Sequence, residues 1–385
     1  MPSRLNNVLS AKVFAILGSS RHNGIICPHS LKTQGNPTVL SLLDLPALKA
    51  LWKERRWGQP SWQAFEKAYF EKLAGSYEEL EAVPAEIVAA LRKDVAFFPL
   101  EVSQEFLAED GTLKLLFETH DGLKFETVLM RYSAAGKSDR FTVCVSSQIG
   151  CPARCAFCST GTMKWSRNLR AEEIVAQVVY FNRRLKTQGA SGARVNNIVF
   201  MGMGEPLLNY TEVKQALNLL LDQRKFNLGP RQISVSTVGI VPGIEQLLAD
   251  QLPTNLAVSL HAPNDELRSR LIPINGSYPL ATLFASLDRW TAQTGKAVFY
   301  QYVMLRGIND QPEHILQLAD WLKARPARLN LIPYNPGPAL QDLDPTEREQ
   351  IFDFALRLRE QGLHVLIRHT FGQDIAAACG QLLIR

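Results

Sequence analysis

The chain has 385 residues, enough for one large domain and a smaller one, and 46% of them are hydrophobic, which allows a sizeable buried core. Its 42 Lys and Arg residues exceed its 37 Asp and Glu residues by 5, a mild basic excess that is compatible with nucleic acid but does not establish it. Three of the six cysteines lie within eight residues, which argues against a disulfide framework and favours a reducing compartment, and no apolar run reaches the ~18 residues of a membrane span.

Residues 1–38 contain no Asp or Glu and carry Arg and Lys among Ser and Asn. Such a segment is typical of an organelle transit peptide, and equally of a disordered basic extension or of a gene start placed too far upstream. We expect a cytoplasmic protein, with import into an organelle as the alternative if the segment is a transit peptide. It holds Cys27 but no candidate site residue, so we predict that it is dispensable for function.

Residues 39–132 are predicted to form a small accessory domain of helices followed by an antiparallel sheet. Leucines recur at helical spacing over residues 43–51, and Pro60-Ser61 is typical of a helix start. Two Asp-Gly turns, at 110–111 and 121–122, separate three alternating strands. These strands are expected at Phe98–Phe106, Leu113–Glu118 and Phe125–Arg131.

A cluster of rings and cations in the helical part of this domain allows two interpretations. Trp52, Arg55, Arg56 and Trp57 combine aromatic rings with basic groups, which can stack on bases and hold phosphates. The same residues fit an aromatic core with solvated arginines at least as well. Glu126, on the last predicted strand of the domain, reads from the sequence alone as an exposed carboxylate.

Over residues 133–385 strand and helix patterns alternate, which predicts a parallel sheet with helices outside it, either a barrel or a doubly wound sheet. The strands are expected at Thr142–Ser146, Asn197–Met201, Gln232–Ser236, Asn255–Leu260, Val298–Met304, Arg328–Ile332 and His364–Arg368. The helices are expected at Ala171–Leu185, Thr211–Leu221, Leu280–Thr291, Pro312–Ala324 and Pro345–Gln361.

The loop after the first of these strands contains Cys151, Cys155 and Cys158 in the spacing C-x3-C-x2-C. Thiolates are soft ligands that suit iron–sulfur clusters and zinc. A structural zinc site normally shows a second close pair of Cys or His, whereas a cube of four irons held by three thiolates leaves one iron open to a substrate. We therefore interpret the triplet as a cluster site; a zinc knuckle or three structural cysteines is the alternative.

Small polar and glycine-containing segments follow several of the strands, at the end where barrel enzymes carry their active sites. In the segment after the second strand, glycines allow the backbone to approach a ligand, and Glu205 could accept a hydrogen bond from an ammonium group. The segments are Met201–Pro206, Ser236–Gly239, Ser259–Ala262 and Pro333–Pro336.

Two further thiols stand apart from the triplet. Cys144 lies on the first barrel strand, and Cys379 lies near the C-terminus, next to Gly380. Each is equally well a small buried hydrophobic residue, although the flanking glycine and a Gln373-Asp374 turn make Cys379 look like a loop thiol.

These features together resemble the RlmN/Cfr family of radical S-adenosylmethionine (SAM) RNA methyltransferases, and more closely its RlmN branch. The resemblance covers about residues 40–385 and implies a partial (β/α)6 barrel behind a small N-terminal accessory domain. It also implies one [4Fe–4S] cluster and two SAM molecules per turnover. It rests on segments 144–151, 158–160, 167–169, 201–209, 259–265, 331–336 and 374–382.

The resemblance implies a role for each candidate residue. The cluster ligands are Cys151, Cys155 and Cys158. The methyl-carrying cysteine, its resolving partner and the proton acceptor are Cys379, Cys144 and Glu126. The positions that bind SAM are Gly204, Glu205, Ser236, Ser259, Leu260, His261 and Asn335.

The implied reaction is a relay, because carbon 2 of adenine is electrophilic and does not attack a SAM methyl group directly. Cys379 takes a methyl group from one SAM, and a radical formed from a second SAM activates that group for addition to the base. Glu126 removes the ring proton. Cys144 then attacks the sulfur of Cys379, which releases methylated RNA and leaves a disulfide for a thiol reductant to reset.

The sequence departs from the family pattern at four positions, Gln301, Arg306, Phe371 and Ala376, where Glu, Asp, Arg and Asp are usual. The loop 161–165 also lacks the usual Gly-Phe. Because the thiols are retained, these differences bear on the RNA target.

The expected function is methylation of carbon 2 of an adenosine in 23S rRNA, with tRNA as a second substrate. We expect a monomer that meets no membrane and draws on an electron donor such as flavodoxin or ferredoxin and on a thiol reductant. Two alternatives stay within the chemistry: methylation at carbon 8, or of a different RNA by a paralogue. A third belongs to another class, a non-catalytic metal-stabilised RNA-binding protein.

Overall fold

The computed structural model describes residues 39–133, 136, 138–188, 193–252, 254–337, 340 and 342–384. The expectations for residues 1–38, including the transit peptide and Cys27, lie outside this part of the chain.

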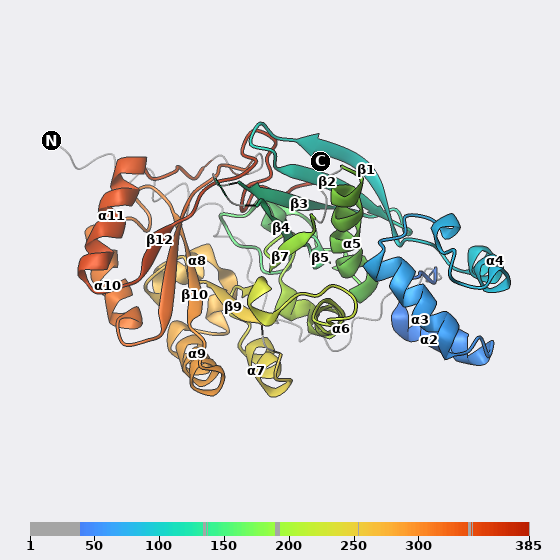
Figure 1. Cartoon of the computed structure of the whole chain (residues 1–385). Coiled ribbons are helices and arrows are strands. Elements are labelled where there is room, and N and C mark those ends of the chain that lie inside the picture. The colour runs from blue at the N-terminus through green and yellow to red at the C-terminus, as the bar shows by residue number, and fades with distance from the viewer. Residues whose placement is uncertain are drawn as a thin grey trace.

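A sheet of ten strands runs through the described residues and organises them (Figure 1). From β4 onward, neighbouring strands are parallel. A separate pair of short strands, β5 (Gln148–Ile149) and β6 (Arg167–Asn168), frames the cysteine loop at its base. The order in the large sheet follows the chain: β1 (Leu100–Leu107), β2 (Leu113–Thr119), β3 (Lys124–Tyr132), β4 (Arg140–Cys144), β7 (Val195–Phe200), β8 (Ile233–Thr237), β9 (Asn255–Ser259), β10 (Val298–Met304), β11 (Ala327–Pro333) and β12 (Val365–Ile367).

Helices separate the parallel strands, so the chain winds through successive β/α units and ends on β12. Figure 1 shows α9, α10 and α11 outside the curved part of the sheet. Among the described strands β12 pairs with β11 alone, which leaves the barrel open on that side, as the predicted partial (β/α)6 barrel requires. The helices are α5 (Ala171–Thr187), α6 (Tyr210–Leu220), α7 (Val241–Ala249), α8 (Asp265–Leu271), α9 (Leu280–Thr294), α10 (Pro312–Leu322) and α11 (Arg348–Glu360).

Two of these helices, α7 and α8, were absent from the sequence prediction. Helix α7 begins Val-Pro-Gly, and Pro and Gly are the poorest helix formers; Pro242 is accommodated because a first-turn N–H needs no partner. Gly243 is required by packing, since a Cβ there would lie 2.6 Å from the Cβ of Leu207. Helix α8 has only seven residues and depends on its cap, in which the Asn264 side chain accepts from the backbone N–H of Leu267 at 2.9 Å.

The core of the barrel lies between the sheet and its outer helices. Val298, Tyr300, Tyr302 and Met304 alternate along β10, and each is at most 1% exposed. The ring of Tyr300 stacks on Phe284 of α9 with 5.6 Å between centroids. This burial is expected for a parallel strand that helices cover.

The accessory helices are α2 (Leu45–Glu54), α3 (Gln59–Glu66) and α4 (Ala85–Asp94). Trp52 is buried and packs edge-on against Trp57 at 4.9 Å and Trp62 at 5.2 Å. Arg55 and Arg56 are exposed. Of the two interpretations of this cluster, the aromatic core with solvated arginines is therefore the one that the fold shows.

The accessory helices are fixed to the barrel by Arg183 of α5. Its guanidinium lies over the rings of Tyr69, Phe97 and Phe98 at 4.7, 5.1 and 5.2 Å from their centroids. Such cation–π contacts gain strength when they are shielded from water.

The antiparallel strands β1–β3 form at the predicted places, but they do not make a separate sheet. Strand β3 pairs with β4, the first barrel strand, and places Val128 opposite Cys144. The predicted boundary between residues 132 and 133 thus lies in the connection between two paired strands. In the part of the chain that the structure describes, no helix is long and apolar enough to cross a membrane.

Candidate active site at the mouth of the barrel

The loop between β5 and β6 carries the cysteine triplet. Cys155 is buried, and Cys151 and Cys158 are half-buried. Burial raises the pKa of all three thiols, that of Cys151 to about 12, and the neighbouring thiols add to the rise for Cys151 and Cys155. The loop backbone is tightly packed, because a Cβ on Gly161 would lie 2.8 Å from the carbonyl oxygen of Cys155.

The donor set of this loop fits an iron–sulfur cluster. Three thiols share one loop, and the repulsion between their thiolate forms is what a bound group with positive iron ions would relieve. Within the described ranges, no three Cys, His, Asp or Glu side chains are placed to hold a single metal ion. A cube of iron ions takes each thiolate at a different corner, so its ligands need not converge as the ligands of one zinc ion do.

Gly204 and Glu205 lie beside the cysteine loop, after β7. Gly204 has φ +98°, and a Cβ there would meet the Cβ of Gln148 at 2.5 Å, so only glycine fits. The carboxylate of Glu205 accepts hydrogen bonds from the backbone N–H groups of Leu207 at 3.0 Å and Val238 at 2.8 Å. Burial nevertheless raises its pKa to about 7.

The end of β9 carries Ser259, Leu260 and His261. His261 adopts φ +56°, and its Nδ1 accepts from the backbone N–H of Val303 at 2.9 Å. Burial lowers the pKa of His261 to about 3, so the ring is neutral and serves as an acceptor. The ring also packs edge-on against Phe157 of the cysteine loop at 4.4 Å, which ties β9 to the triplet.

Sequence reasoning missed Arg268, a buried arginine of α8 that braces these strand ends. Its guanidinium donates to the carbonyl oxygens of Val238 at 2.6 Å, Ser259 at 3.1 Å and Leu260 at 3.2 Å. A fourth bond goes to Oδ1 of Asn275 at 2.7 Å. The only indication in the sequence was that Arg268 shares the buried face of a short helix with apolar residues, and this helix was not predicted.

Of the remaining positions assigned to SAM, Ser236 is the next-to-last residue of β8 and is buried, and Asn335 follows β11 and is buried as well. The Asn335 side chain donates to the carbonyl oxygen of Pro333 at 3.2 Å. Gln301 of β10 supports the end of β9 through its main-chain carbonyl oxygen. This oxygen accepts from the backbone N–H groups of Leu260 at 3.0 Å and His261 at 3.2 Å. The departure of Gln301 from the family pattern therefore leaves this backbone contact in place.

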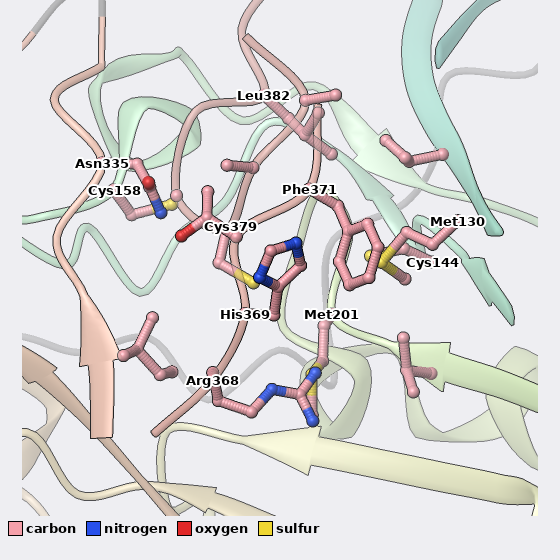
Figure 2. A pocket seen from close by; sticks show the side chains of 18 of the residues that line it. Met130, Cys144, Cys158, Met201, Asn335, Arg368, His369, Phe371, Cys379 and Leu382 are labelled. Atoms are coloured by element: carbon pink, nitrogen blue, oxygen red, sulfur yellow. The ribbon is translucent and has the colours of Figure 1, made fainter. Parts of the chain in front are cut away.

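A pocket of about 770 Å³, a volume that includes its opening to solvent, lies next to the triplet. Cys158, Cys144 and Cys379 all line it (Figure 2). Asn335 and Arg368 line it as well. The pocket thus joins a candidate cluster ligand, a candidate SAM position and both isolated thiols.

The two isolated thiols differ in their surroundings. Cys144 is buried, and burial, followed by the nearby Cys379, raises its pKa. Cys379 is exposed to solvent and lines the pocket. The protein packed around it raises its pKa, and the guanidinium of Arg368 acts in the opposite direction.

The loop that carries Cys379 is docked on the turn between β1 and β2. The Asp110 carboxylate accepts from the backbone N–H of Gly372 at 2.9 Å. In return, the Asp374 carboxylate accepts from the backbone N–H of Glu109 at 3.1 Å. These bonds join residues that lie far apart in the sequence, so neither segment by itself predicts them.

The other side of the same loop is held by the residues that follow Cys158. The backbone N–H of Ser159 donates to the carbonyl oxygen of Gly380 at 2.8 Å. The hydroxyl of Thr160 donates to the carbonyl oxygen of Leu382 at 2.8 Å. Cys379 is thereby fixed directly beside the cysteine triplet.

Glu126 is buried on β3, contrary to the exposed carboxylate that the sequence alone suggested. It forms an ion pair with Lys114 at 2.9 Å and accepts from the backbone N–H of Leu383 at 2.9 Å. Burial raises its pKa, and Lys114 opposes that rise. Val128 and Met130 on the same face of β3 line the pocket, so Glu126 lies in line with the pocket wall but beneath the C-terminal segment.

An open parallel barrel with three cysteines in the loop after its first strand defines a radical SAM enzyme. The model of the radical SAM superfamily matches residues 145–319. A solved radical SAM methyltransferase from Sphaerobacter thermophilus is 39% identical, with a TM-score of 0.84, and the match covers 89% of this chain and 99% of that one.

Similar proteins of known family show to which group of radical SAM enzymes the chain belongs. A protein of Chloroflexus aurantiacus is 42% identical over 85% of this chain and 88% of its own length, and one of Thermosynechococcus vestitus is 43% identical over 87% and 95%. Both are named probable dual-specificity RNA methyltransferase RlmN. The chain belongs to the RlmN family and is a radical SAM RNA methyltransferase. The family implies SAM and an iron–sulfur cluster.

Proposed function

We propose that this enzyme methylates carbon 2 of an adenosine in RNA through a methyl group carried on Cys379. The proposal rests on one observation: Cys379 and Cys144 line the same pocket, and Cys158 of the cysteine triplet lines it too. An electrophilic ring carbon does not displace a methyl group from SAM, so the group needs a carrier. A carrier of this kind needs two thiols, one to hold the methyl group and one to release the product.

The cofactors would be held by residues already described. Cys151, Cys155 and Cys158 would bind the cluster, and the positions around Gly204, Glu205 and the strand ends of β8, β9 and β11 would bind SAM. When bound, these groups supply the methyl group and the one-electron chemistry that activates it. The carboxylate of Glu205 is placed to accept a hydrogen bond from an ammonium group next to the cysteine loop.

Cys379 acts first. Its thiolate attacks the methyl carbon of SAM, so that a carbon–sulfur bond forms, the bond from methyl to the sulfonium breaks, and S-adenosylhomocysteine leaves. Burial raises the pKa of Cys379, and the positive charge of Arg368 opposes that rise and so favours the thiolate. Exposure to solvent in the pocket gives the thiol access to SAM and later to RNA.

Glu126 and Cys144 complete the relay. Glu126, poised by a pKa that burial raises, removes the proton from the ring carbon once the methyl-derived carbon is attached. The one electron that radical addition leaves on the ring would pass back to the iron–sulfur cluster, so that the adduct is closed-shell. Cys144 then attacks the sulfur of Cys379, the carbon–sulfur bond breaks toward the adenine ring, and the released carbon takes a proton to become methyl. The disulfide that remains is reduced by a thiol.

The word dual-specificity in the names of the relatives supports two RNA targets, and we propose 23S rRNA and tRNA. A flavodoxin or ferredoxin would supply electrons to a monomer. These assignments follow the RlmN branch of the family.

The test is mass spectrometry of nucleosides from rRNA and tRNA of cells that lack their own enzyme and express either this chain or its Cys379→Ala variant. We expect 2-methyladenosine with the wild-type chain and none with the variant. Methylation at carbon 8 gives a nucleoside of equal mass that chromatography against standards separates. Its appearance, or unmodified RNA in cells with a cluster-loaded enzyme, would overturn the proposal.

A further inference from the structure

Three aromatic residues form a connected group at the pocket. The ring of Phe371 packs edge-to-face with Tyr132 of β3 at 4.6 Å and with His369 at 4.8 Å. The interplanar angles are 63° and 82°. Contacts on two sides fix the orientation of the Phe371 ring, so it offers a pre-formed surface rather than a freely rotating one.

This aromatic group belongs to the pocket of the two thiols. Phe371 and His369 both line it, together with Cys144 and Cys379, as Figure 2 shows. His369 is exposed, and Phe371 and Tyr132 are half-buried. Aromatic rings that complete a hydrophobic core are normally buried, so these rings keep accessible surface at the place where a substrate must approach Cys379.

The charges around the group favour an anionic chain. Arg368, between the aromatic residues and β12, lines the pocket. The guanidinium of Arg140 lies 5.9 Å from the centre of the Tyr132 ring. The nearby carboxylate of Asp139 is paired with Arg131 at 2.6 Å, which reduces its repulsion of phosphates. Rings flanked by cations are the combination that single-stranded nucleic acids bind.

We propose that Phe371 and His369 form the stacking surface for the target nucleobase and thereby determine which RNA position reaches Cys379. The inference rests on the proposed function, since it takes the substrate to be a purine in RNA. The base stacks on the ring surface, while Arg368 and Arg140 receive the flanking phosphates. Phe371 is thus a substrate-positioning residue, distinct from the thiols that carry the chemistry.

A fluorescent base tests this inference without turnover. The probe is an RNA stem–loop with 2-aminopurine in the loop, whose amino group occupies the position that would be methylated. We expect the anaerobic wild-type holoenzyme to quench the probe, because stacking on aromatic rings quenches 2-aminopurine. Phe371→Leu should bind it roughly tenfold more weakly and quench it less, as expected for the loss of a stacking contact. Phe371→Tyr, which keeps a ring face, should behave like the wild type.

The matched control is Phe352→Leu. Phe352 is also a half-exposed ring next to an arginine, with Arg348 at 5.6 Å, but it lies on α11 away from the pocket. If Phe371→Leu loses iron, Phe371→Met replaces it in the assay. Quenching by the wild type that persists in Phe371→Leu or Phe371→Met, or an absence of quenching by the wild type, would overturn the inference.

Methylation of Cys379 separates this inference from the proposed function. That first step needs no RNA, so peptide mass spectrometry should find S-methylcysteine at Cys379 in both wild type and Phe371→Leu. An unmethylated Cys379 in the wild type counts against the carrier mechanism, whereas the stacking surface is judged by quenching alone. A merely structural role for Phe371 would lower iron content and Cys379 methylation together with binding.

Discussion

Cys144 and Cys379 line the same pocket but have different access to solvent. Cys379 is exposed and has Arg368 beside it, which suits a thiol that must meet two large substrates. Cys144 is buried on β4; burial raises the pKa of both thiols, and the positive charge of Arg368 opposes the rise at Cys379 as well as at Cys144. The exposed thiol suits the proposed carrier of the methyl group, and the buried thiol suits the residue proposed to release the product.

Single substitutions of the two thiols should fail at opposite ends of the reaction. Cys379→Ala should keep its cluster and methylate nothing. Cys144→Ala still accepts the methyl group and reaches the base, but it forms no disulfide, so RNA should stay bonded to Cys379. Denaturing gels of each variant, purified after expression and treated with nuclease, measure this adduct, and the double variant should resemble Cys379→Ala. A cluster-loaded Cys144→Ala free of RNA would show that the roles are wrong.

A buried carboxylate of α5 should make stability depend on pH. Burial raises the pKa of Glu172 from 4.5 to about 7 despite its ion pair with Arg170. A raised carboxyl pKa contributes stability that is present below pH 4.5 and is lost as pH rises through 7, by about 3 kcal/mol at most. Glu172→Gln should therefore match the wild-type melting temperature near pH 4.5 and exceed it by a few degrees at pH 8.

Calorimetric scans of the holoenzyme at the two pH values provide the measurement. Glu86→Gln is the control, because Glu86 occupies the first turn of α4 but is exposed. Equal pH dependence in Glu172→Gln and the wild type would contradict the burial argument.

The motif residues could be predicted at this scale because their spacing is local, as in the cysteine triplet. The residues that contact Glu126 could not be predicted from the sequence. Lys114 lies on another strand, and Leu383 comes from the far end of the chain. A single strand sequence does not tell which of its polar faces a distant segment will cover, so an exposed carboxylate was the natural expectation.

At the scale of elements, the short helix α8 supports the ends of two barrel strands. It is too short to be stable alone, yet it carries the arginine that binds the carbonyl ends of β8 and β9. The barrel strands could be predicted because they are short apolar runs bounded by turns. Helices α7 and α8 escaped prediction because proline, glycine and short length hide the helical period, and packing against the barrel stabilises them instead.

Arg268→Met should lower both stability and SAM binding. Methionine fills part of the volume but donates nothing, so three carbonyl groups lose their buried donor, at a cost of about 1–3 kcal/mol for each such group. Arg270→Met on the same helix is the control. Thermal melting and equilibrium dialysis with SAM on anaerobic protein give the two readouts. Normal SAM affinity in a destabilised Arg268→Met would limit the role of Arg268 to folding.

At the scale of the molecule, the accessory helices and the barrel are held together by the Arg183 contacts and by the shared sheet. The α/β class and barrel order could be predicted from alternating patterns. The docking of the C-terminal loop on the β1–β2 turn could not, because it depends on hydrogen bonds between segments that only the finished fold brings together.

Residues 1–38 should be dispensable for catalysis, since they contain no acid and no candidate site residue. A truncated chain that starts at Thr38 should keep its iron, its SAM affinity and its activity on RNA. Iron analysis and the nucleoside assay described above check this expectation. A folded, cluster-loaded truncation without activity would instead identify the segment as an RNA-binding arm.

The pairing of β3 with β4 has a mechanical consequence. Because Val128 and Cys144 are opposite each other in one sheet, the strands that carry Glu126 and Cys144 are hydrogen-bonded side by side and should move together. The Glu126 carboxylate is held by Lys114 and by the backbone N–H of Leu383, so the bond to Leu383 must break before the C-terminal segment uncovers it. We therefore expect the C-terminal loop to be the part that moves in each catalytic cycle. Hydrogen exchange should find its amides opening at each turnover while those of β3 and β4 stay closed.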